Sequence, residues 1–228
     1  MQPAKSWSTS NTTLLQSVTN ESSANPSGGI APFETESLSR SSMFTAPRVW
    51  WMLRVMGANK VRILDGGFDN WKKDGRPVTD AATPAGHGEF IANFNDSRIA
   101  SFPMIQSIVA EGGAQIADAR SPGRFSGSEP EPREGMRSGH MPGAFNIPVM
   151  TLSENGYLKD TDALKSVFEK AGMDLDKPVV TSCGSGVTAA AIILALESLG
   201  HQDNRLYDGS WSEWGSRDDT PVETGNSR

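Results

Sequence analysis

Residues 178–199, PVVTSCGSGVTAAAIILALESL, decide the fold. The β-branched residues at 179–181 predict a buried strand, and the almost wholly apolar run from Thr188 to Leu199 predicts a buried helix. Between them lies a glycine-containing loop that begins at Cys183. A strand that passes through a short loop into a helix is the unit from which parallel sheets are built.

The same alternation continues on both sides of this stretch. Short apolar segments at 115–117, 145–147 and 205–207 predict further strands, and helices are expected at 104–110 and from Thr161, as the cap, to Gly172. Apolar strands that alternate with helices predict an α/β fold, a parallel sheet flanked by helices on both faces.

The region before this domain has a different texture. Residues 1–42 contain 11 Ser and 5 Thr with no apolar period, so we expect this segment to be disordered. Pro47 suits the start of a helix that ends at Gly57, and residues 61–64 (VRIL) predict a strand. Residues 76–100, rich in Pro and Gly, predict a linker to the second domain.

An internal repeat links the two regions. Residues 57–71 and 200–214 are offset by 143 positions and share Gly, Arg, Asp, Gly and Trp at equivalent places. Two copies of one fold are therefore expected, a first copy at residues 43–75 and a second, catalytic copy at residues 101–228. The position equivalent to Cys183 is Arg40, so only the second copy has the thiol.

The first copy is expected to be truncated. Counterparts of Asp118 and His140 would fall before residue 1, so the first half of that copy has no equivalent here. The missing strands would pair with residues 61–64 and cover Trp50, Trp51 and Leu53. Without them we expect a free sheet edge and exposed apolar surface.

Composition excludes several classes of function. The formal net charge is -6, and no basic stripe suggests nucleic acid as a partner. The longest apolar stretch, 187–196, is too short to cross a bilayer, so no membrane partner is expected. One cysteine allows no internal disulfide and no multi-cysteine metal cage, which suits a reducing cytoplasm, and the 3 His show no ligand spacing, so no metal is expected.

The loop at Cys183 predicts a reactive thiol. Gly184 and Gly186 permit positive φ values in a tight loop whose N–H groups point inward, and the following helix adds the positive end of its dipole. A lone cysteine is more often a small buried hydrophobe, but the strand-loop-helix position favours a nucleophile. A cysteine phosphatase uses a similar loop but needs Arg six positions after the cysteine, where this chain has Ala189.

Five motifs together resemble the tandem-domain rhodanese family: CGSGVTA (183–189), LYDGSWSEW (206–214), DAR (118–120), GHMPG (139–143) and APRVWW (46–51). The resemblance covers residues 43 to about 223. It implies a rhodanese-like parallel sheet in each copy, with a first domain that is inactive and a second that carries the cysteine. It also implies that His140, in the GHMPG motif, is structural.

The resemblance further implies sulfur transfer through a Cys183 persulfide, without a cofactor. Members that use thiosulfate carry two basic residues after the cysteine, whereas Gly184 and Ser185 stand there, which favours 3-mercaptopyruvate as donor. Arg124 and Arg133 would bind its carboxylate, a task suited to the guanidinium fork. The other residues expected at the sulfur are the rest of the loop: Ser185, Gly186, Val187 and Thr188.

The implied acceptor is a thiol or cyanide, with a thioredoxin-like protein as one such thiol. In the family a His and an Asp of the first domain complete a proton relay with the loop serine, here Ser185, and neither has a matching position in this sequence. Two alternatives therefore stay open, a thiosulfate sulfurtransferase and a catalytically weak or inactive rhodanese-like binding module.

Overall fold

The computed structural model describes residues 44–81 and 90–226. The disorder expected for residues 1–42 lies outside this part of the chain. The described elements are, in chain order, α2 (Ala46–Val55), α3 (Gly67–Lys73), η1 (Asp96–Arg98), β1 (Ile99–Ala100), α4 (Phe102–Glu111), β2 (Gln115–Asp118), α5 (Pro122–Ser126), β3 (Phe145–Asn146), η2 (Val149–Thr151), β4 (Ser153–Glu154), β5 (Tyr157–Leu158), α6 (Thr161–Lys170), β6 (Val179–Ser182), α7 (Ala189–Ser198), β7 (Asn204–Tyr207) and α8 (Ser210–Trp214).

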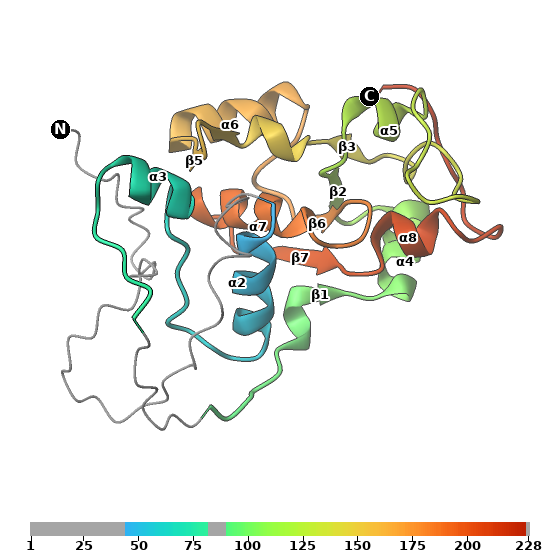
Figure 1. Ribbon diagram of the computed structural model, residues 1–228. Helices are drawn as coiled ribbons and strands as arrows, with labels where there is room; N and C mark the ends of the chain where they lie inside the picture. The colour runs from blue at the N-terminus through green and yellow to red at the C-terminus, as the bar shows by residue number, and fades with distance from the viewer. Residues whose placement is uncertain (1–43, 82–89, 227–228) are drawn as a thin grey trace.

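The predicted parallel sheet is confirmed. Its strands lie in the order β1-β7-β6-β2-β3, and all four neighbouring pairs are parallel (Figure 1). Strand β6 is central and buried at all four residues. Strand β1, at the edge, falls at the end of the segment expected to be a linker. Because β6 is central, the loop that follows it is flanked by neighbours on both sides.

Helices cover both faces of the sheet. Val179 packs in one apolar cluster with α2, α6 and α7, whereas Val180 packs in the other with α4, α5 and α8. In β2, Ala117 belongs to the first of these clusters and Ile116 to the second. Successive residues of a strand point to opposite faces, so each strand contributes to both cores.

Several boundaries and small elements differ from expectation. Helix α6 is capped by Asp160, whose Oδ1 accepts from the N–H of Ala163 at 2.9 Å, and not by Thr161, which is already helical. Helices α3, α5 and α8 were not predicted. Each is 5 to 7 residues long, which is too short to show a helical period.

The predicted strand at 61–64 is wrong. Residues 61–64 have no regular secondary structure, although Val61 and Ile63 pack against the core as partly buried side chains. The equivalent segment of the second copy is β7, which pairs with a strand on each side. An extended segment forms a strand only when its backbone makes hydrogen bonds with an adjacent strand. No described strand pairs with residues 61–64.

The expected exposure of the first copy's tryptophans is also wrong. Trp50 is 5% exposed and Trp51 3%, and both belong to the core cluster that contains Ile193 of α7. Helix α2 packs against α7, next to which it lies in Figure 1. The second copy therefore covers the face that we expected the missing strands to leave open.

The repeat itself is confirmed by the element positions. Helices α2 and α7 occupy equivalent residues at the offset of 143, and α3 and α8 begin at equivalent residues. Arg54 and Glu197 are equivalent positions, and they bind each other, with Nη1 2.9 Å from Oε2. Contact between equivalent residues is the arrangement found at a two-fold axis, and the equivalent helices α2 and α7 contact each other through this pair.

Within the described residues, no helix is long and apolar enough to cross a membrane.

Candidate active site

Cys183 follows directly on β6 and is buried, with 2% of its surface exposed. Its backbone is held by the start of α8, because its carbonyl accepts from the N–H of Trp211 at 2.9 Å and its N–H donates to Ser210 Oγ at 3.2 Å. Ser210 Oγ in turn donates to the carbonyl of Tyr207 at 2.9 Å. The thiol therefore sits at a fixed point where the carboxyl ends of β6 and β7 meet.

In the cysteine loop, residues 183–188, the carbonyls of Gly184 and Gly186 point toward other parts of the protein. The carbonyl of Gly184 accepts from Ser212, from the N–H at 2.8 Å and from Oγ at 2.6 Å. The carbonyl of Gly186 accepts from Nη1 of Arg48 at 3.3 Å. In a trans peptide the N–H points opposite to the carbonyl that precedes it, so the N–H groups of Ser185 and Val187 face away from these partners.

The N–H groups of the loop are left available to a ligand. In the part of the chain that the structure describes, the five N–H groups from Gly184 to Thr188 donate no hydrogen bond. They lead into the amino-terminal end of α7, which carries the positive end of the helix dipole. Successive free N–H groups of this kind form a concavity that binds anions, so the cysteine loop can stabilise negative charge on sulfur.

The two loop glycines serve different purposes. Gly186 has a φ of +78°, as expected, and a Cβ there would lie 2.7 Å from Oδ1 and 2.8 Å from the carbonyl oxygen of Asp208. The expected positive φ of Gly184 is wrong, since its φ is not in that region. A Cβ on Gly184 would instead lie 2.8 Å from Nη2 of Arg124, so its missing side chain makes room for that guanidinium.

Arg124 is held against the cysteine loop by Glu131. Its Nε lies 3.2 Å from Oε1 and its Nη2 2.5 Å from Oε2 of that carboxylate. The Glu131 side chain is 2% exposed, whereas that of Arg124 is 26% exposed. The guanidinium can therefore still meet a small ligand from the solvent side.

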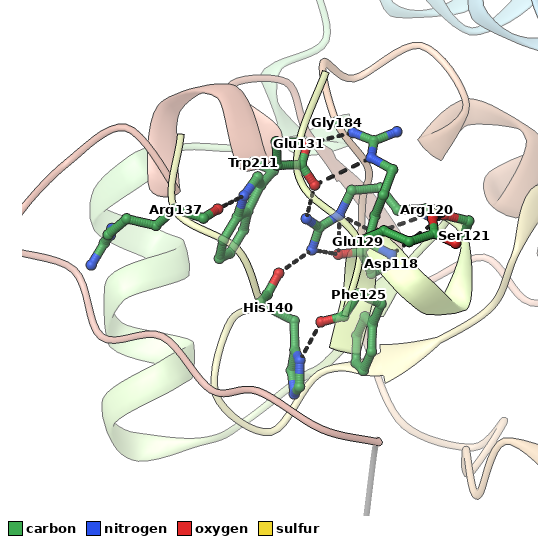
Figure 2. Close-up of polar contacts among 12 residues, drawn as sticks. Asp118, Arg120, Ser121, Phe125, Glu129, Glu131, Arg137, His140, Gly184 and Trp211 are labelled. Carbon is green, nitrogen blue, oxygen red and sulfur yellow. Dashed lines mark hydrogen bonds and ion pairs between the residues drawn. The ribbon is translucent and has the colours of Figure 1, made fainter. Parts of the chain in front are cut away.

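Glu131 also binds a second, buried arginine. Arg120 Nη1 lies 2.8 Å from Oε1 of Glu131, and its Nη2 lies 2.6 Å from Oδ2 of Asp118 (Figure 2). The guanidinium of Arg120 also stacks 4.4 Å over the ring of Trp211. Burial lowers the pKa of Arg120, but the two carboxylates outweigh burial and raise it. This network fixes the position of Glu131, and through it that of Arg124.

Arg133 reaches the same side of the loop through a hydroxyl. Its Nη1 donates to Ser212 Oγ at 3.1 Å, and Ser212 Oγ donates to the carbonyl of Gly184. The structure therefore brings both predicted arginines to Gly184, one by direct packing and the other through Ser212.

The remaining predicted loop residues are more open. Ser185 is exposed, and Val187 and Thr188 are half-buried. Thr188 occupies the cap position of α7 without a side-chain cap bond. The expectation that His140 is structural agrees with its contacts, because its ring is buried, stacks on Phe125 at a centroid distance of 3.8 Å and lies 2.8 Å from the Phe125 carbonyl through Nδ1.

Sequence reasoning missed five residues that shape the site: Arg48, Glu131, Asp208, Ser210 and Ser212. Four of them lie inside the motifs APRVWW and LYDGSWSEW. The motifs therefore identified the segments near the site, but they did not show which side chains contact the cysteine loop. Glu131 lies in a Pro- and Glu-rich loop, where a carboxylate is ordinarily solvated. Among the described residues, no three His, Cys, Asp or Glu side chains are placed to hold a metal ion.

Comparison with known proteins places this geometry in a family. The family model for the Rhodanese-like domain matches residues 104–217. The chain is 47% identical over 182 residues to a 3-mercaptopyruvate sulfurtransferase of Escherichia coli, covering 80% of this chain and 65% of that protein. It is 42% identical over 183 residues to a thiosulfate sulfurtransferase of Bos taurus, covering 79% and 61%.

A solved structure agrees with these sequence matches. The crystal structure of SseA from Escherichia coli, described as a 3-mercaptopyruvate sulfotransferase with the rhodanese fold, superposes with a TM-score of 0.67 at 43% identity, covering 76% of this chain and 65% of that one. The chain thus spans 61% to 65% of the length of these three relatives. Since the family model matches half of the chain and the strands, helices and cysteine loop agree with the fold, the chain belongs to the rhodanese family.

Proposed function

We propose that this chain is a sulfurtransferase that takes sulfur from 3-mercaptopyruvate onto Cys183 and passes it to a thiol or to cyanide. The observation that carries the proposal is the run of five available N–H groups that begins immediately after the chain's one cysteine. A persulfide and a thiolate are both anions, and such a loop stabilises both.

The proposed reaction has two steps. The Cys183 thiolate attacks the sulfur of 3-mercaptopyruvate, an S–S bond forms, and the C–S bond breaks with its electron pair left on carbon as the enolate of pyruvate. Protonation of that carbon releases pyruvate and leaves the enzyme persulfide. An acceptor thiolate or cyanide then attacks the outer sulfur, the S–S bond breaks, and the Cys183 thiolate is regenerated. No electrons enter or leave overall, so no cofactor is needed.

The side chains around the loop favour a carboxylate donor. Arg124 and Arg133 both stand beside Gly184, and each can offer a charge-assisted hydrogen bond to a carboxylate. The two positions after the cysteine are Gly184 and Ser185, so the loop itself adds no side-chain charge for the thiosulfate dianion. The similarity to 3-mercaptopyruvate sulfurtransferases supports the same donor.

Three further parts of the proposal rest on the sequence. We retain residues 101–228 as the catalytic domain and residues 43–75 as the remnant of an inactive one, joined by residues 76–100. A thioredoxin-like protein is a suitable acceptor because it presents a thiolate. A reducing compartment such as the cytoplasm would keep Cys183 available.

Intact mass spectrometry tests the proposal directly. Wild-type protein incubated with 3-mercaptopyruvate should gain the mass of one sulfur atom, and cyanide should remove it with release of thiocyanate. The variant Cys183→Ser should gain nothing, because a hydroxyl cannot carry sulfane sulfur. The same experiment is repeated with thiosulfate as the donor. Wild-type protein that gains no sulfur from 3-mercaptopyruvate or from thiosulfate would be a binding module, and protein that gains sulfur faster from thiosulfate would be a thiosulfate sulfurtransferase.

A further inference from the structure

Among the described residues, the cysteine loop accepts one hydrogen bond from a side chain of the first copy. Arg48 of α2 places Nη1 3.3 Å from the carbonyl oxygen of Gly186 and 2.5 Å from Oδ1 of Asp208. These two acceptors are separated from Arg48 by 138 and 160 residues in the chain. The first copy has no thiol, yet one of its side chains binds the loop that holds the thiol of the second copy.

The position of the Arg48 side chain is defined on several sides. Its guanidinium lies 4.9 Å from the ring centroid of Trp51, one helical turn along α2, and its side chain is 19% exposed. Asp208 neutralises its charge. Gly186 leaves no room for a side chain here, because a Cβ would lie 3.2 Å from Arg48 Nη1 as well as against Asp208.

The contact sets the direction of one peptide in the loop. The carbonyl of Gly186 points toward Arg48, so the N–H of Val187, across the same trans peptide, points the opposite way. The other two outward carbonyls, of Cys183 and Gly184, bind backbone N–H groups of α8. Toward the carboxyl end of the loop, the side chain of Arg48 binds the carbonyl of Gly186 in the same way.

We propose that Arg48 is a positioning residue for Cys183, which acts from the first copy by holding the Gly186 peptide with its carbonyl outward and the Val187 N–H available to anionic sulfur. Arg48 does not touch the donor in this role. Its removal should therefore slow the step in which charge forms on sulfur, and it should leave donor binding, which we assign to Arg124 and Arg133, nearly unchanged. The catalytic part of this inference rests on the proposed function.

The test compares Arg48→Met with Arg54→Met. Methionine keeps an aliphatic stem over Trp51 but cannot bind Gly186 or Asp208. Arg54 lies on the same helix and also forms an ion pair with the second copy, at Glu197, which retains its bond to Arg98 at 2.8 Å. Both variants thus lose one ion pair between the copies, and only Arg48→Met loses a contact to the cysteine loop.

The first readout is the rate constant for alkylation of Cys183 by iodoacetamide, which needs no turnover. We expect Arg48→Met to react several-fold more slowly than wild type and Arg54→Met to react within about twofold of it. In steady-state assays Arg48→Met should lose roughly tenfold in kcat with little change in KM, the size of one charge-assisted hydrogen bond. The variant Arg48→Lys, which keeps the charge for Asp208, should recover part of both rates.

Thermal melts of all three variants identify any general loss of folding. If Arg48→Met unfolds, Arg48→Lys and the variant Asp208→Asn supply the same comparison with milder changes. Equal alkylation rates in Arg48→Met and wild type, or equal losses in Arg48→Met and Arg54→Met, would overturn the inference. A wild-type protein that forms no persulfide would overturn the proposed function, while the alkylation rates would still decide the role of Arg48.

Discussion

Replacing Glu131 with Gln should loosen Arg124 and destabilise the fold. The carboxylate accepts three hydrogen bonds from two guanidinium groups, one from Arg120 and two from Arg124. Glutamine has the same shape but replaces one acceptor oxygen with an NH2 group, which would face a guanidinium donor. The substitution therefore removes the negative charge and at least one bond from a side chain that is 2% exposed.

The size of the effect follows from burial. A hydrogen bond between charged groups contributes about 1.5 to 3 kcal/mol to the free energy of unfolding. The buried guanidinium of Arg120 would also lose one of the two negative charges beside it, which lowers the stability further. Asp118 remains bound to Arg120, with Nη2 and Oδ2 2.6 Å apart, so the loss should stay below that of a fully unpaired buried charge. We expect about 2 to 3 kcal/mol, or a decrease in Tm of about 5 to 10 °C for a protein of this size.

Differential scanning calorimetry and donor kinetics measure the two consequences. Glu129→Gln is the matched control, because Glu129 is exposed and its carboxylate accepts a long hydrogen bond from Ser121 Oγ at 3.4 Å. Glu129→Gln should stay within about 0.5 kcal/mol of wild type. Glu131→Gln should also raise the KM for 3-mercaptopyruvate, since Arg124 would no longer be held beside Gly184. If Glu131→Gln has the Tm and KM of wild type, the network does not position Arg124.

Three further outcomes are expected. Arg133→Ala should raise the KM for 3-mercaptopyruvate by about tenfold through loss of a charge-assisted hydrogen bond, and an unchanged KM would remove Arg133 from the site. Gly186→Ala should lower the free energy of unfolding in urea by at least about 2 kcal/mol, because alanine would be held at a positive φ and its Cβ would lie too close to the Asp208 carbonyl oxygen. A smaller decrease would mean that the loop adjusts freely. Burial and the bond to Glu213 raise the pKa of Tyr207 above its ordinary value of 10.0, so the stability that the neutral phenol contributes is complete below about pH 10 and is lost as the pH rises further. Melting curves between about pH 8 and 11 should therefore decline less steeply for Tyr207→Phe than for wild type, and parallel declines would contradict the assignment.

The elements that could be predicted from the sequence are those whose signal is local. Residues 179–181 are β-branched and residues 189–196 are apolar, and β6 and α7 form there because such side chains are stabilised where an element is buried. Residues 61–64 carry the same local signal as β7 but form no strand. Whether these residues form a strand depends on the presence of a neighbouring strand, and the local sequence carries no information about that neighbour.

The form of the cysteine loop could be predicted from the sequence, but the contacts that hold it could not. The glycines around Cys183 indicated a loop with inward N–H groups, and the available N–H groups of the loop agree with that expectation. The partners that orient the loop come from α2 and α8, far from it in sequence. Glu131 illustrates the same limit, since a carboxylate in a Pro- and Glu-rich loop is expected in water, and its burial follows from Arg120 and Arg124.

The two copies differ in the residues that their equivalent helices, α2 and α7, carry at the contact between them. Equivalent helices meet at Arg54 and Glu197, so each copy presents the same helix to the other. In α7 most of the residues are buried and apolar, and the counterpart of Arg48 there is Ala191, which is 0% exposed. Helix α2 instead carries basic residues toward the second copy, one to Glu197 and one to the cysteine loop. In the role proposed for Arg48, a copy without a thiol would still act in sulfur transfer, because its helix α2 would support the cysteine loop of the other copy.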